Sequence, residues 1–159
     1  FPDIDWDYID DHLSDDEVFA IKPHPWYYQY ISKTITDKQY RHIIGIPGDE
    51  PSAPYLYDAD VVITDYSSIM FDAYLLGKPV VLFEKNPGYL QTRGMYLDYP
   101  SQYSSRYATD ERKLLTLLRT AEVLTDTERE CIRIVADMCD GHSCERICNL
   151  INQLNGGET

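Results

Sequence analysis

At 159 residues, the chain has the length of one domain and enough sequence to bury a sizeable core. No run of about 18 apolar residues occurs, which excludes a membrane-spanning helix, and the net charge of -13 argues against a nucleic-acid backbone as partner. The chain begins FPDIDWDYIDD, with neither an initiator methionine nor a basic, apolar leader. We therefore expect a piece of a longer protein without an export signal.

The first part of the chain alternates between helical and extended patterns. Apolar residues at helical spacing predict a helix over 6–13, and residues 17–22 (EVFAIK) have the character of a short buried strand. A helix over about 26–33 and a second strand over 42–46 (HIIGI) follow. The segment 47–51, with two prolines and a glycine, predicts a loop.

The second part repeats this alternation. Its predicted elements are a short helical turn near 53–57, a strand over 60–64 (DVVIT), a helix over 67–76, a strand over 79–83, an irregular stretch over 84–108, and helices over about 110–122, 126–139 and 143–154. Continuous apolar strands that alternate with helices are typical of a parallel sheet covered on both faces. The sequence therefore predicts a Rossmann-like α/β fold, in which ligands bind beyond the carboxyl ends of the strands.

The turn after the strand over 60–64 carries the strongest local signal. Asp65, Tyr66, Ser67 and Ser68 lie between this strand and the next helix. A helix N-terminus offers unpaired backbone N–H groups and the positive end of the helix dipole. With two hydroxyls at the same place, the pattern indicates a phosphate or diphosphate site. An ordinary Asp/Ser cap fits the local pattern equally well.

A second signal follows the first predicted strand. Lys22, Pro23, His24 and Pro25 form a KPHP segment in which the two prolines restrict the backbone around the histidine. An imidazole at the carboxyl end of a strand faces the ligand crevice in this architecture, where it can stabilise charge on a phosphoryl or leaving group. The alternative is a histidine that only hydrogen-bonds its loop.

The cysteines of the last third raise the question of a zinc site. These cysteines are Cys131, Cys139, Cys144 and Cys148, and His142 lies among them as a further possible ligand. Structural zinc sites usually pair their ligands across a tight turn. Cys144 and Cys148 are instead four residues apart on an apolar helical stripe. We expect buried free thiols there and no metal.

Four motifs in order resemble those of the CDP-glycerol glycerophosphotransferases, of the teichoic acid polymerase or primase type. TDYSSIMFD follows ADVVI and precedes GKPVVLFE, as in that family's signature, and KPHP resembles its short His-Pro element one strand earlier. Residues 89–99 (YLQTRGMYLDY) and 140–146 (DGHSCER) resemble two later family segments. GxGxxG and Walker-type sequences are absent, so dinucleotide and ATP binding have no support.

The resemblance implies the two-domain glycosyltransferase-B fold, with residues 1–159 as the C-terminal domain that binds CDP-glycerol. It implies transfer of glycerol phosphate from CDP-glycerol to a teichoic acid chain or lipid-linked primer, with release of CMP. It also implies a cytoplasmic protein that is peripheral on the inner face of the cell membrane, needs no cofactor and places no metal on the diphosphate. No contact with nucleic acid is expected.

Roles for individual residues follow by motif. His24 would contact the phosphoryl group or assist catalysis, while Ser67 and Ser68 would hold the diphosphate. Asp65 and Asp72 would bind a donor hydroxyl or fix the turn. The remaining expected donor or phosphate contacts are Thr64, Arg93 and Arg146.

Two departures from the family pattern are expected. The N-terminal acceptor domain and the first strand of the C-terminal domain, which should precede Asp5, are both missing from the sequence. That strand would be central, so its absence should leave a seam in the sheet. The alternatives are a donor domain of another glycosyltransferase-B enzyme or of a capsule or ribitol-phosphate transferase, or a non-catalytic nucleotide-binding module.

Overall fold

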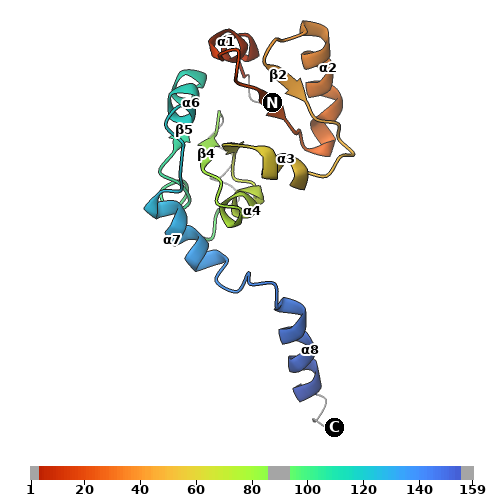
Figure 1. The fold of residues 1–159 in the computed structure, drawn as a ribbon, viewed down its shortest axis with the longest axis vertical. Helices are drawn as coiled ribbons and strands as arrows, with labels where there is room; N and C mark the ends of the chain where they lie inside the picture. Colours follow the sequence, from red (N-terminus) through yellow and green to blue (C-terminus); the bar gives the residue numbers. More distant parts are fainter. Residues whose placement is uncertain (1–3, 86–93, 155–159) are drawn as a thin grey trace.

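The computed structural model describes residues 4–85 and 94–154, apart from the side chain of Trp26. Figure 1 shows the helices and strands in chain order. The first group is α1 (Trp6–His12), β1 (Phe19–Ile21), η1 (Pro25–Tyr27), α2 (Tyr28–Lys38), β2 (Ile43–Gly45) and α3 (Ala53–Asp58). The second group is β3 (Val62–Thr64), α4 (Ile69–Leu75), β4 (Val80–Phe83), β5 (Tyr107–Ala108), α6 (Glu111–Leu118), α7 (Asp126–Val135) and α8 (Ser143–Leu154).

The described strands form two parallel ladders. In the first, β1 pairs with β2 and Phe19 faces Ile43. In the second, the order is β3-β4-β5, with Val62 opposite Val80 and Leu82 opposite Tyr107. All pairings are parallel, as continuous apolar strands that alternate with helices predict.

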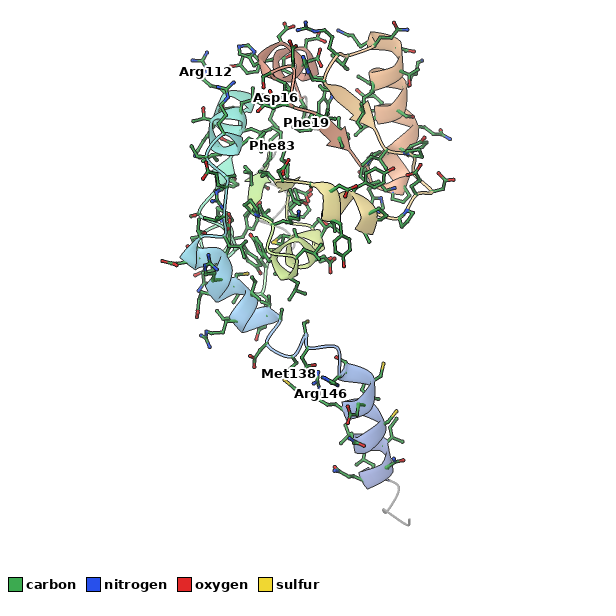
Figure 2. The ribbon with its side chains drawn as sticks, viewed as in Figure 1. Asp16, Phe19, Phe83, Arg112, Met138 and Arg146 are labelled. Carbon is green, nitrogen blue, oxygen red and sulfur yellow. The ribbon has the colours of Figure 1, made fainter. Side chains whose placement is uncertain are left out.

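One apolar core connects the two ladders. Most of its buried members come from α1, β1, α2, β2, β4, β5 and α6, and they include Ile9, Ile21 and Val81. Phe19 from β1 and Phe83 from β4 pack against this same cluster, and Figure 2 shows both side chains between the two halves of the molecule. The ladders are therefore held by a shared core although the described residues contain no hydrogen-bonded pairing between them.

A second core lies on the opposite face of the second ladder. There α4 and α7 cover Val62, Val80 and Leu82, and Met70 and Cys131 are completely buried. Because α4 follows β3 directly, its first turn lies at the carboxyl end of that strand. This position is where the sequence predicts a phosphate site.

Several boundaries differ from the predicted ones, among them those of α2 and α7, and β5 was not predicted. Helix α2 continues to Lys38 and ends where Gln39 adopts a left-handed conformation with φ 52°. Strand β5 falls in the stretch predicted to be irregular, since two residues are too few for a periodic signal. Helix α7 ends at Val135, the last of its residues that packs on the second core; Met138 beyond it is exposed.

Helix α8 lies away from the rest of the chain, at the lower end of the molecule in Figure 1. Cys144 and Cys148, predicted to be buried, are exposed, as is Cys139. That prediction was wrong because the apolar stripe of α8 has no covering element among the described residues, and only Cys131 is a buried thiol. No described helix has both the length and the apolar character required to cross a membrane.

Candidate functional site

The loop after β1 carries His24. Its neighbour Pro23 is buried and His24 itself is exposed, so the loop is anchored on one side of the imidazole. The backbone N–H of Tyr27 donates to the His24 carbonyl at 2.8 Å, and the two rings meet edge to face with centroids 6.4 Å apart. These contacts join His24 to the start of η1.

Lys22 ties this loop to the one that follows β2. Its ammonium donates to the carbonyl oxygens of Pro47 and Gly48 at 2.9 and 3.0 Å. The lysine of the KPHP segment therefore connects two loops that follow neighbouring strands.

The turn after β3 is organised by Asp65. Its Oδ1 accepts a hydrogen bond from the backbone N–H of Ser67 at 3.0 Å, and the Ser67 hydroxyl oxygen accepts one from the N–H of Ile69 at 3.5 Å. Ser68 takes the N-cap position of α4 without a side-chain cap bond. Both serines are exposed, and Thr64 at the end of β3 is half-buried. Of the two roles left open for Asp65, the structure shows the contact that fixes the turn.

The charge at this turn depends on its carboxylates. Burial raises the pKa of Asp65, while hydrogen bonds from the backbone N–H groups of Ser67 and of Asp65 itself act in the opposite direction. Burial therefore makes the charged form of Asp65 less favourable at this turn than it is in water. Asp72 lies exposed in the first turn of α4.

A buried carboxyl that sequence reasoning did not assign lies beside this turn. Glu84 directly follows β4 and is only 4% exposed. Its Oε2 accepts a hydrogen bond from the hydroxyl of Tyr107 at 3.1 Å. The sequence does contain a pattern that could have identified Glu84 as a candidate. It is the first polar residue after an apolar strand, as Asp65 is after β3.

The predicted site residues are not all brought together. His24 and the serine pair follow strands of different ladders, so their approach to one ligand stays a prediction. Arg146 binds Asp140 through two contacts of 2.8 Å and also donates to the Met138 carbonyl. In Figure 2 it lies beside Met138, away from α4. Arg93 lies outside the described residues.

The described residues contain no group of three His, Cys, Asp or Glu side chains arranged to hold a metal ion. His142 instead contacts Glu145 at 3.3 Å.

The solved structure of a variant of the wall teichoic acid polymerase TagF matches this fold with a TM-score of 0.71 and 21% identity, over 94% of this chain and 37% of that one. The Rossmann-like α/β architecture of the glycosyltransferase-B type, predicted from the sequence, is thereby confirmed. The model of the CDP-glycerol:poly(glycerophosphate) glycerophosphotransferases matches residues 1–153, and the chain belongs to that family.

Three curated relatives have names that refer to teichoic acid synthesis. A teichoic acid poly(ribitol-phosphate) polymerase of Bacillus spizizenii is 26% identical over 95% of this chain and 24% of its own length. A teichoic acid glycerol-phosphate transferase of Staphylococcus aureus is 24% identical, over 87% and 36% respectively. A teichoic acid glycerol-phosphate primase of Bacillus subtilis is 28% identical, over 89% and 36%. The chain thus spans a quarter to about a third of these relatives.

Proposed function

We propose that the enzyme carrying this chain transfers glycerol phosphate from CDP-glycerol to a teichoic acid chain or lipid-linked primer and releases CMP. The observation that carries the proposal is the Asp65–Ser68 turn, which exposes two hydroxyls at the start of α4 in a member of the glycerophosphotransferase family. The relatives named as a glycerol-phosphate transferase and primase support the same chemistry.

In this proposal, the acceptor's hydroxyl oxygen attacks the phosphorus that bears the glycerol. The new P–O bond forms, the bond to the CMP oxygen breaks, and the proton of the hydroxyl passes to solvent. Ser67 and Ser68 hold the diphosphate, while His24 stabilises the negative charge that develops on the departing CMP. Asp65 acts indirectly, by fixing the turn on which both serines lie. The reaction uses no metal on the diphosphate.

We also propose that residues 1–159 are the donor-binding domain and that the acceptor domain and one further strand come from outside this sequence. The coverage of the relatives supports the first part. The strand orders β1-β2 and β3-β4-β5 support the second, because β1 and β3 are each paired on one side only among the described residues. A parallel strand between them would join both ladders into one sheet, and membrane contact would come from the other parts of the protein.

A second candidate is transfer of ribitol phosphate from CDP-ribitol. The relative from Bacillus spizizenii, which is named as a ribitol-phosphate polymerase and is matched over 95% of this chain, favours it. Both candidates share the diphosphate and differ in the polyol.

Calorimetric titration of the full-length protein with CDP-glycerol, CDP-ribitol and a UDP-sugar tests these proposals. Tightest binding of CDP-glycerol, followed by release of CMP on addition of a teichoic acid acceptor, is the expected result. Preference for CDP-ribitol would transfer the assignment to the second candidate. Binding of the UDP-sugar alone would refute both.

A further inference from the structure

Three side chains form a polar cluster at the carboxyl end of β4, next to the short strand β5. Glu84 follows β4 and is bound by the Tyr107 hydroxyl from β5. Tyr99 stands with its ring perpendicular to that of Tyr107, with centroids 6.0 Å apart and an interplanar angle of 85°. Neither Glu84 nor the two tyrosines have a part in the transfer proposed above.

Two atoms of this cluster are buried without a hydrogen-bond partner among the described residues. They are Oε1 of Glu84 and the hydroxyl of Tyr99. Leaving a buried donor or acceptor unpaired destabilises a protein, and the great majority of such groups in proteins are paired. An unpaired acceptor and an unpaired donor in one cluster offer the two contacts that a single hydroxyl group can make.

Strand geometry places the cluster beside the donor turn. Leu82 pairs with Thr64 on one side and with Tyr107 on the other, and side chains two residues apart on a strand share a face. Glu84 and Tyr107 thus lie on the face that α4 covers, where Tyr99 also packs. In agreement with this placement, the charge of Asp65 contributes to the raised pKa values of Glu84 and Tyr99, after the larger effect of burial.

We propose that Glu84 and Tyr99 bind a hydroxyl of the donor's polyol. An alcohol both donates and accepts, so it can give its proton to Oε1 of Glu84 and accept one from Tyr99. Burial, together with the neighbouring Glu84 carboxylate, raises the pKa of Tyr99, so that its hydroxyl keeps the proton it donates. The inference rests on the proposed function, since it places the polyol next to a diphosphate held at Ser67 and Ser68.

The clean variant is Tyr99→Phe in the full-length protein, with CDP-glycerol and CDP as the two ligands. CDP has the nucleotide and the diphosphate but lacks the polyol. We expect the variant to lose roughly tenfold in affinity for CDP-glycerol, the size of one lost hydrogen bond, and to bind CDP as the wild type does. Its thermal midpoint should not fall, because the deleted hydroxyl has no partner among the described residues.

Tyr74→Phe is the matched control, since the Tyr74 hydroxyl is also buried but donates to the Tyr103 carbonyl at 2.9 Å. It should lower the thermal midpoint and leave the ratio of the two affinities unchanged. Glu84→Leu should repeat the selective loss, and Glu84→Gln, which keeps an acceptor oxygen, should restore much of it.

Equal losses for CDP and CDP-glycerol, or no loss in Tyr99→Phe, would overturn the inference alone, provided that the wild type binds both ligands. A wild-type protein that binds neither would overturn the proposed function and this inference with it.

Discussion

Arg106 and Glu128 form a buried ion pair in which one guanidinium nitrogen lies 2.9 Å from each carboxylate oxygen. Glu128 is completely buried, and it also accepts hydrogen bonds from the Ser104 hydroxyl and from the backbone N–H of Thr125, at the start of α7. The pair therefore anchors α7 to the segment that enters β5. Helix α7 packs with α4 on the face of the second ladder that carries Glu84, so the ion pair stabilises that face.

Arg106→Met should destabilise the protein strongly, because it leaves the Glu128 carboxylate buried without its cation. We expect a loss of about 3–5 kcal/mol in the free energy of unfolding, measured by urea denaturation. Arg133→Met is the control: Arg133 binds Glu130 at 2.6 Å, but both side chains are more than half exposed. Its loss should stay below about 1 kcal/mol. Similar losses in the two variants would contradict the anchoring role.

Glu111 should make stability depend on pH. Burial alone would raise its pKa, but hydrogen bonds from Lys85 and from the backbone N–H of Asp5 hold the pKa of Glu111 below its ordinary value. A carboxyl with a lowered folded-state pKa stabilises the fold above its unfolded-state pKa of about 4.3, and loses that contribution as the pH falls through the folded-state pKa.

Glu111→Gln should therefore be less stable than the wild type by about 1–2 kcal/mol at pH 7. The difference should shrink steadily between about pH 5 and pH 3, as the wild-type carboxyl becomes protonated. Urea denaturation of both proteins at four pH values gives the comparison. A difference that does not change with pH would show that Glu111 acts by its shape and not by its charge.

The fold class could be predicted because its strongest signals are local. The strands over 60–64 and 79–83 are continuous apolar runs, and Gly77 between them ends α4 with a positive φ of 75°. Strand β5 could not be predicted, because Tyr107 and Ala108 form a strand only by pairing with the already formed β4. Burial at the α8 stripe was predicted wrongly, because an apolar pattern does not show whether a neighbouring element covers it.

Contacts among the candidate site residues could be predicted only where they lie within one turn. Asp65, Ser67 and Ser68 are neighbours in sequence, and their contacts follow from that. The role proposed for Glu84 depends on tyrosines 15 and 23 positions further along the chain, which only the folded sheet brings to it. Arg146 was predicted to bind a phosphate of the donor. In the structure it forms a local ion pair with Asp140.

The two exposed serines should contribute to donor binding and not to folding. Replacing both Ser67 and Ser68 with alanine should weaken CDP-glycerol binding by about 1–3 kcal/mol, the size of lost hydrogen bonds to a charged group. Their exposure predicts a change in stability within about 0.5 kcal/mol. Ser32→Ala on α2 is the control and should change neither quantity. Unchanged affinity in the double variant would remove the serines from the donor site.

The cysteines and the histidine near α8 should bind no metal. Cys139, Cys144 and Cys148 are exposed, and His142 contacts Glu145. Elemental analysis of the dialysed protein should find far less than one zinc per chain, and a chelator should leave turnover unchanged. One zinc per chain that survives dialysis would contradict this.

His24 should matter for turnover and little for folding. It is exposed in a loop whose neighbour Pro23 is buried and whose partner Lys22 is bound to the Pro47 and Gly48 carbonyls, so the loop should keep its shape without the imidazole. A protonated imidazole near the donor would offset the charge that builds on the phosphate oxygens as CMP leaves. We expect His24→Ala in the full-length protein to lower turnover by roughly a hundredfold or more, the size of one positioned acid, with a nearly unchanged thermal midpoint.

Exposed His12, on α1, supplies the control His12→Ala, which should retain full turnover. Retention of turnover by His24→Ala, or a loss that follows a lowered thermal midpoint, would show that His24 is a structural residue of its loop.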